Sequence, residues 1–431
     1  MPRLLLPVFL ILLLVVAFLG GRFTAKAPAI QPEASLDGPM AQAWEDFIRA
    51  QRETLSLYRG SEFFVDDQER AEAYRSVLYA LVGSIKSGAL MSRDHPRLMT
   101  AMDWASKGGL DNPDNNDLVA MLHDDEDYRV SGQRGSSAKL EFQLLVGQPG
   151  VAGTGTTIPV SVLDGADIQF GEDGSFEIII SRDDPGPGRN WLVSDEGAET
   201  LLVRQTHVDW GLERPGLMRI ERMGAEGESA VQLTPAIIAR GLRRAAVQLF
   251  ERGAVSLEMA ERTWNLMPRN GISAVLPDED GREGQYSAFG SWQLDNGKAI
   301  ILSTAPSSAR YQGIQLANLW LTSLDYETRA TSLSLDQMEC SADGRCYTVI
   351  SHRDPGIQNW LDTEGHLRGL IVMRWQGLPG ELPEAQQPTA QLVDFSRLRE
   401  ELPEDVALFS PEQRREQIRQ RRANVHERNR G

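Results

Sequence analysis

Two related stretches decide the fold of this chain. The second copy reads Asp343-Gly-Arg-Cys-Tyr-Thr-Val-Ile-Ser-His-Arg-Asp-Pro-Gly356 and continues into Asn359-Trp-Leu361. The first copy reads Asp173-Gly-Ser-Phe-Glu-Ile-Ile-Ile-Ser-Arg-Asp-Asp-Pro-Gly186 and continues into Asn190-Trp-Leu192. In both, the aspartate of Asp-Pro-Gly follows the glycine of Asp-Gly by ten positions. Agreement at this many ordered positions indicates an internal repeat rather than chance.

Each copy predicts a hairpin turn, a strand, a tight turn with a buried tryptophan behind it, and a further strand. In Asp-Pro-Gly, proline presets the first turn angle, glycine accepts a positive φ, and the aspartate side chain caps the turn. The tryptophan gives the corner a large apolar anchor. The residues that both copies share therefore have a structural explanation, and the differences between the copies are the better place to look for function.

Short alternating or β-branched runs, separated by Gly, Pro and Asp, predict strands on both sides of a helical insertion. The expected strands are 139–146, 157–163, 176–181 and 201–208 in the first half, and 299–303, 311–321, 346–352 and 370–375 in the second. The fold class is mainly β with helical additions: a β-sandwich region built from two related units.

Helical spacing of apolar residues predicts helices at 41–58 and 66–86, a third helix at 95–106, and the insertion at 234–267. The loop 109–117 is dense in turn-forming residues. The expected organisation is a signal or anchor segment (1–27), a tether (28–40), a helical lead-in (41–127), a first β unit (128–232), a helical insertion (233–270), a second β unit (271–380) and a polar C-terminal tail (381–431).

The tail contains a capping box, Ser410 with Gln413, that starts a helix with Pro411 in its first turn. This helix is polar on every face, which is typical of a segment that is solvated or lies on a partner. Its arginines are able to contact anionic lipid; they are Arg414, Arg415, Arg419, Arg421 and Arg422.

The N-terminus resembles an export signal, because Arg3 precedes an apolar run of 18 residues at 4–21. That length is at the lower limit for a membrane-spanning helix. A small-residue pattern at 25–27 is followed at once by Pro28, which hinders cleavage and favours an uncleaved anchor. The sequence therefore predicts attachment to a membrane through this segment, with a cleaved signal as the alternative.

Two cysteines, Cys340 and Cys346, bracket the turn dipeptide Asp343-Gly344. Cysteines on facing hairpin strands come within disulfide range, and disulfides persist in oxidising compartments. We expect a disulfide and a location in the cell envelope, anchored in the inner membrane and facing the periplasm, or free in the periplasm if the signal is cleaved.

The composition excludes several classes of function. A formal charge of -17 repels phosphate backbones, so no nucleic-acid partner is expected. No glycine-rich phosphate loop is present, and Ser303 and Ser323 lie in no Gly-x-Ser-x-Gly elbow. The six histidines have no zinc spacing, and no metal site is expected. The acidic loop with Asp111, Asp114, Asn116 and Asp117 is expected to be a solvated turn rather than a calcium site.

The second half resembles a known bacterial family. The run Tyr311-Gln-Gly-Ile-Gln-Leu-Ala-Asn-Leu-Trp320, then Ser323-Leu-Asp-Tyr326, and the stretch from Ser351 to Asp362 are similar to the family called domain of unknown function 1214, often found with domain of unknown function 1254. The first copy looks like a diverged version of the same core. The resemblance implies a β-sandwich of jelly-roll type, and it implies no activity.

Two classes of function follow from the second copy. A binding protein would use a concave sheet face lined by Trp320, Tyr326 and Trp375, with Arg374 and Arg353, for a small organic or sugar-like ligand. An envelope hydrolase or lyase would use His352 as acid or base, Asp354 or Asp325 as its partner, and Arg374 as an anion clamp. We favour binding, because no established catalytic constellation is present. The sequence leaves the cofactor and the oligomeric state open.

Overall fold

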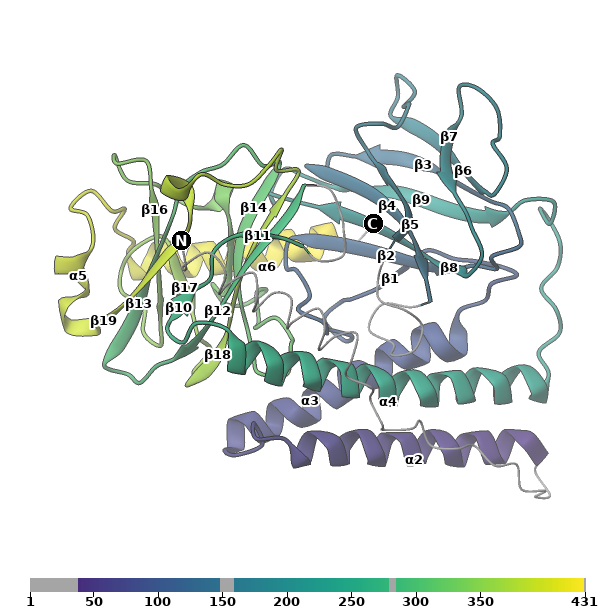
Figure 1. Cartoon of the computed structure of the whole chain (residues 1–431), viewed down its shortest axis with the longest axis horizontal. Helices are drawn as coiled ribbons and strands as arrows, with labels where there is room; N and C mark the ends of the chain where they lie inside the picture. Colours follow the sequence, from purple (N-terminus) through teal and green to yellow (C-terminus); the bar gives the residue numbers. More distant parts are fainter. Residues whose placement is uncertain (1–37, 148–158, 279–283, 430–431) are drawn as a thin grey trace, which may run out of the picture.

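The strands form two β units that lie next to each other, each made of two sheets (Figure 1). A computed structural model of the chain describes residues 38–147, 159–278 and 284–429. The expected β-rich architecture in two halves, preceded by helices, is confirmed. In these three ranges no helix is long and apolar enough to cross a membrane. The apolar run 4–21 lies outside the described residues.

The first β unit contains sheets ordered β1-β2-β8-β4-β5 and β7-β6-β3-β9. The two sheets share one apolar core, with Phe142 and Val203 from one sheet and Ile178 from the other. The strands are β1 (Met99–Thr100), β2 (Asn115–Met121), β3 (Tyr128–Gly135), β4 (Lys139–Val146), β5 (Pro159–Asp164), β6 (Ser175–Ser181), β7 (Asn190–Val193), β8 (Ala198–Thr206) and β9 (Pro215–Arg222).

The second β unit contains sheets ordered β10-β12-β18-β14-β15, with β11 also on β12, and β17-β16-β13-β19. Trp292, Trp375 and Ile350 lie in the core between them. The strands are β10 (Gly271–Ile272), β11 (Leu276–Pro277), β12 (Gln285–Gln293), β13 (Lys298–Thr304), β14 (Tyr311–Ala317), β15 (Ser332–Ser334), β16 (Cys346–Ser351), β17 (Trp360–Asp362), β18 (Arg368–Gln376) and β19 (Thr389–Asp394).

The duplication extends over eight strands of each unit. The orders β2-β8-β4-β5 and β7-β6-β3-β9 recur as β12-β18-β14-β15 and β17-β16-β13-β19, and β6-β7 and β16-β17 are parallel pairs in both. The last residues of β8 and β18, Thr206 and Gln376, are equivalent, and their side chains are hydrogen-bonded to each other at 2.8 Å. Contact between equivalent positions is what a two-fold arrangement produces, so the units pack about an approximate two-fold axis.

The repeated motif makes the same hydrogen bonds in both units. The Asn190 amide donates to the carbonyl oxygens of Glu177 and Gln169, and the Asn359 amide donates to those of Tyr347 and Glu339. In each motif the tryptophan indole nitrogen donates to the carbonyl of the serine that ends the preceding strand. The shared residues therefore fix the corner that joins two strands.

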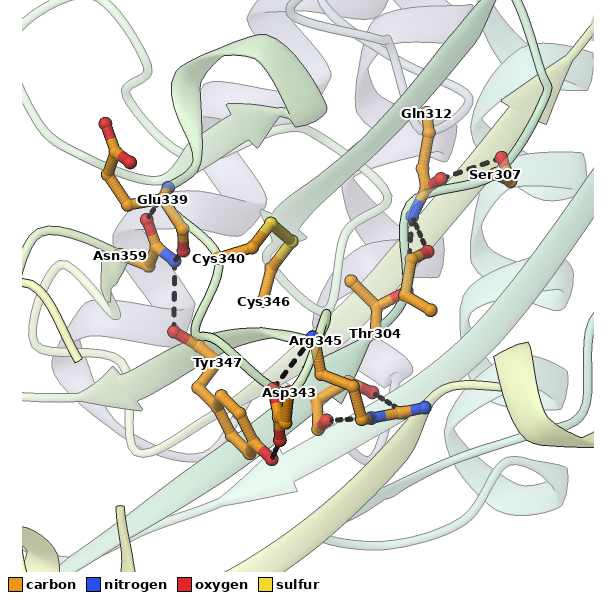
Figure 2. The surroundings of a disulfide bond; sticks show 12 residues. Thr304, Ser307, Gln312, Glu339, Cys340, Asp343, Arg345, Cys346, Tyr347 and Asn359 are labelled. Carbon is orange, nitrogen blue, oxygen red and sulfur yellow. Dashed lines mark hydrogen bonds between the residues drawn. A yellow bond between two sulfur atoms is a disulfide. The ribbon is translucent and has the colours of Figure 1, made fainter. Parts of the chain in front are cut away.

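A disulfide joins Cys340 to Cys346, as expected (Figure 2). Between them Gly344 has a φ of +81°, and the Asp343 carboxylate accepts hydrogen bonds from the Arg345 amide at 2.9 Å and the Tyr347 hydroxyl at 2.6 Å. The turn is thus held both covalently and by its own aspartate.

Three long helices and one π-helical turn form a layer beneath the strands (Figure 1). They are α2 (Gly38–Gly60), α3 (Asp67–Ser84), η1 (Ile85–Leu90) and α4 (Pro235–Leu266), the last being the expected insertion. Tyr58, Phe63 and Trp264 of this layer pack on Trp320 and Leu370 of the second unit.

The prediction of a third helix at 95–106 is wrong. This segment contains only β1 and turns. The Asp103 carboxylate accepts hydrogen bonds from the Ala105 amide and the Ser106 hydroxyl, and the Lys86 ammonium donates to it at 2.6 Å. These local bonds compete with a helix.

The expected unit boundaries also differ from the structure, because β2 begins at Asn115 and β19 extends the second unit to Asp394. The remaining short elements are η2 (Leu335–Gln337), η3 (Glu384–Gln386), η4 (Phe395–Arg397) and α5 (Leu398–Glu401).

The C-terminal helix α6 (Pro411–Arg428) lies on the protein itself, so the expectation of a solvated tail is wrong. Its capping box forms as expected. Arg414, Arg421 and Arg428 are buried and seven residues apart, which places them along one helix face. Arg414 is bonded to Asp354 of the second unit, whereas Arg421 and Arg428 lie over the Trp210 ring of the first. The helix therefore links the two units.

We expect Arg421→Ala to lower the free energy of unfolding by about 2 to 4 kcal/mol. The guanidinium donates to the carbonyl and hydroxyl of Ser332 and to the carbonyl of Tyr326, and the substitution leaves these buried acceptors unpaired. Urea denaturation measures the change. Arg419→Ala, on the exposed face of α6, is the matched control and should change stability by less than about 0.5 kcal/mol. Equal losses in the two variants would contradict the linking role.

Replacing both cysteines by serine should lower stability by about 2 kcal/mol, because the bond closes a short loop in the unfolded chain. Denaturation with and without reductant measures this loss. The wild type should lose stability on reduction, and the double variant should not respond to the reductant.

Candidate functional site

A small pocket opens where α3 meets two loops, 103–111 and 318–327. Its volume is about 190 Å³. The side chains around it are Arg75, Tyr79, Trp104, Lys107, Ser323, Asp325, Tyr326 and Glu327. Pockets for drug-sized molecules are commonly about 300 to 1,000 Å³, so this one suits a smaller ligand.

Lys107 forms one wall of the pocket. Its ammonium donates hydrogen bonds to the Ser323 hydroxyl at 3.0 Å, the Ser323 carbonyl at 3.1 Å and the Leu324 carbonyl at 3.2 Å. It also lies 4.4 Å from the centre of the Tyr326 ring. Burial lowers the pKa of Lys107, while the carboxylates of Asp111 and Asp325 oppose this shift. All three N–H donors of the ammonium are in use, so the charged form is the one that fits these contacts.

Ser323 connects Lys107 to a buried carboxylate. Its hydroxyl donates to Asp111 Oδ2 at 2.6 Å, and its amide donates to Oδ1 at 2.9 Å. Lys107, Ser323 and Asp111 thus form a chain of hydrogen bonds from the ammonium through the hydroxyl to the carboxylate. A lysine whose three donors are occupied has no lone pair to take a proton from serine, so this chain positions the loop rather than activating a nucleophile.

The backbone around the pocket is strained. Leu110, Leu321 and Glu364 have φ angles of 58°, 57° and 53°, which residues other than glycine rarely adopt. The Leu110 amide donates to the Leu321 carbonyl at 2.8 Å, and the Glu364 carboxylate accepts from the Asp325 amide at 3.0 Å. Strain of this kind costs about 1 to 3 kcal/mol per residue and collects at functional sites.

Ionisable groups supply both donors and acceptors to the pocket. Arg75 forms an ion pair with Glu72 while remaining partly exposed. Burial would raise the pKa of Asp325, but hydrogen bonds from the Thr328 hydroxyl and from backbone amides outweigh it, so the pKa is lowered. Asp325 is therefore an ionised acceptor at the pocket.

Behind the pocket, α3 buries two carboxyl groups against the second unit. Glu72 accepts from the Asn318 amide at 3.0 Å, and Glu69 accepts from the Trp320 indole at 3.1 Å. Burial raises the pKa of Glu69 to about 7. Burial also lowers the pKa of His366, which lies 3.8 Å from Glu72, to about 4.

The residues expected to bind a ligand are not brought to one surface. Trp375 lies in the core between the two sheets of the second unit, and Trp320 lies between that unit and the helices. Both are almost fully buried, and each belongs to a separate apolar cluster. Arg374 donates to Gln315 and to the Leu110 carbonyl. It thus supports the strained loop. Of the expected set, only Tyr326 borders the pocket.

The residues expected to act in catalysis are also apart. His352 has both ring nitrogens engaged, with Thr363 at 2.6 Å and the Leu294 carbonyl at 3.0 Å. Asp354 caps its own turn and pairs with Arg414 of α6. Asp325 lies in the pocket.

Arg353, expected beside the ligand, instead lies over the Phe395 ring. The acidic loop is buried rather than solvated: Asp111, Asp114 and Asp117 are each less than a tenth exposed. In the ranges that the structure describes, no group of three or more His, Cys, Asp or Glu is arranged to hold a metal ion.

Comparisons with known proteins find a similar solved structure. No protein-family model and no curated protein matches the chain. The crystal structure of an uncharacterized protein from Burkholderia cenocepacia is similar with a TM-score of 0.75 and 26% sequence identity, over 83% of this chain and 98% of that chain. The crystal structure of the VPA0106 protein from Vibrio parahaemolyticus gives a TM-score of 0.42 at 11% identity, over 81% of this chain and 100% of that chain. The first likeness shows that the two-unit architecture recurs in another protein.

We expect Glu69→Gln to flatten the pH dependence of stability. Between about pH 4.5 and 7 the unfolded chain releases the Glu69 proton while the folded chain keeps it, so the wild type loses up to about 3 kcal/mol as pH rises. The variant lacks this loss of stability and should therefore be more stable than the wild type at pH 8. Urea unfolding at pH 5 and pH 8 measures the effect, with Asp67→Asn, at an exposed position of the same helix turn, as the control. A constant difference at both pH values would contradict the shifted pKa.

Proposed function

We propose that the chain is a cell-envelope binding protein whose pocket between α3 and loop 318–327 takes a small polyhydroxylated, sugar-like molecule. The observation that carries the proposal is the combination of an exposed indole and fixed polar groups at one pocket. Trp104 is 75% exposed at the pocket, which is unusual for a residue that normally buries its large apolar area. An indole face of this kind suits stacking against the apolar face of a sugar ring.

The polar groups match alternating donors and acceptors on a polyol. Arg75 and Tyr79 offer donors, and Asp325 and Glu327 offer carboxylate oxygens. Glu327 is held by His426 of α6 at 2.6 Å, and Asp325 by its own turn, so the acceptors are positioned before a ligand arrives. Preorganised polar groups reduce the entropic cost of binding.

An envelope hydrolase or lyase is the second candidate, and the Lys107–Ser323–Asp111 chain does not favour it, because the lysine has no lone pair to take a proton from Ser323. His352, expected as the base, donates or accepts at both nitrogens within its own corner. The envelope location, the N-terminal attachment to a membrane and the jelly-roll description of the sandwiches remain predictions from the sequence. The disulfide supports the location, because disulfides persist mainly in oxidising compartments.

Isothermal titration of the full chain with monosaccharides, disaccharides, polyols and sugar acids tests the proposal. We expect at least one of these ligands to bind, and Trp104→Ala to weaken its affinity about tenfold through the lost stacking. Trp44→Ala removes another exposed indole that lies outside the pocket and should leave affinity unchanged.

Recovery of the ligand separates the two candidate functions. A ligand recovered unchanged supports binding, whereas turnover that is lost in Ser323→Ala would make the pocket an active site. Equal binding by wild type and Trp104→Ala would contradict the site, and the absence of binding across the panel would contradict the ligand class.

A further inference from the structure

Two helices of the helical layer, α2 and α4, begin at the same end of the layer. α2 and α4 run in the same direction, since Arg243 donates to the Pro39 carbonyl near both starts and Asn265 donates to Glu62 near both ends. The end of η1 lies at the same place, because Arg244 donates to the Gly88 carbonyl at 3.1 Å. Figure 1 shows the starts of α2 and α4 together at the right-hand end of the layer.

This end exposes apolar side chains to solvent. They are Met40, Trp44, Leu90, Val231 and Leu233, exposed by 38%, 53%, 69%, 69% and 67%. Val231 and Leu233 immediately precede the N-cap of α4, and Leu90 ends η1. Single exposed apolar residues are ordinary, but five at one end of a helical layer mark a contact surface.

Three arginines lie at the same end, although the chain carries a net charge of -17. Arg240, Arg243 and Arg244 lie in the first turns of α4. Across the described ranges no carboxylate lies within ion-pair distance of any of the three. Arginine, tryptophan and leucine together are typical of a surface that lies at the boundary between lipid headgroups and acyl chains.

The anchor predicted at residues 4–21 would place this end close to a membrane. The apolar run ends at Gly21, and 16 residues (22–37) lead from it to Gly38, where α2 begins. Sixteen residues reach at most about 50 to 60 Å even when fully extended. A membrane-embedded run would therefore hold the start of α2 near the bilayer surface.

We propose that this end of the helical layer, with its five apolar residues and three arginines, lies on a bilayer surface that contains anionic lipid. The arginines contact headgroups, and the apolar side chains enter the interface. In helix α6, Arg414, Arg421 and Arg428 are buried within the protein and are not available to headgroups. The proposal is independent of the ligand pocket.

The test uses the full chain reconstituted in phosphatidylcholine vesicles with and without phosphatidylglycerol. A polarity-sensitive fluorophore is attached at Leu233→Cys, and in a control at Leu212→Cys, which is 80% exposed on the first β unit. The native cysteines do not react, since they form the disulfide. Brominated lipid should quench the label at position 233 several-fold more strongly than at 212, and phosphatidylglycerol should increase the difference.

Charge reversal tests the arginines. Arg240→Glu, Arg243→Glu and Arg244→Glu together should reduce quenching at position 233 to the level at 212, while the apolar anchor keeps the chain on the vesicle. Equal quenching at the two positions in the wild-type background would overturn the proposal. A spectral shift of the label at 233 that grows with protein concentration and needs no vesicles would assign the surface to self-association and would also overturn it.

Discussion

The arrangement of the two β units depends on the burial of one carboxylate, Asp114. It accepts hydrogen bonds from the Trp210 indole of its own unit at 2.8 Å and from the Tyr311 hydroxyl of the second unit at 2.7 Å. Burial raises the pKa of Asp114, while Tyr311 and Arg428 oppose the shift. A buried charge is tolerated only when it is paired and hydrogen-bonded. Because of this requirement, both units and α6 meet at Asp114.

The pocket follows from this junction. Leu110 and Asp111 lie a few residues before Asp114, and Tyr326, whose carbonyl accepts from Arg421, closes the opposite side. The strained backbone at Leu110 and Leu321 persists because Arg374, Lys107 and Asp111 hold both loops from behind. A pocket built in this way is rigid before a ligand enters. This rigidity suits recognition of a small polar molecule better than a reaction that needs a mobile base.

Much of the fold could be predicted from the sequence, because its signals are local. The repeat, the insertion helix and the disulfide each depend on residues close together in the chain. The buried face of α6 also had a local signal: arginines at 414, 421 and 428 share one side of a helix. It was missed because arginine normally indicates solvent, and its aromatic partner Trp210 lies far away in the sequence. The third expected helix does not form, because the Asp103 carboxylate accepts hydrogen bonds from nearby residues. The spacing of apolar residues in the sequence does not reveal such bonds.

The site could not be predicted in the same way. Lys107 and Ser323 are 216 residues apart, and Arg75 and Trp104 belong to no motif. His352 stands in the second copy where the first copy has Arg182, and its ring lies within its own corner, engaged by Thr363 and the Leu294 carbonyl. Only tertiary packing brings the pocket together.

Amide hydrogen exchange of the full chain, with and without a saturating sugar-like ligand, tests the central claim most directly. The account predicts added protection confined to residues 103–111 and 321–328, with the outer strands of both sandwiches unchanged. Protection centred on either sandwich face, or none in these two loops, would contradict it.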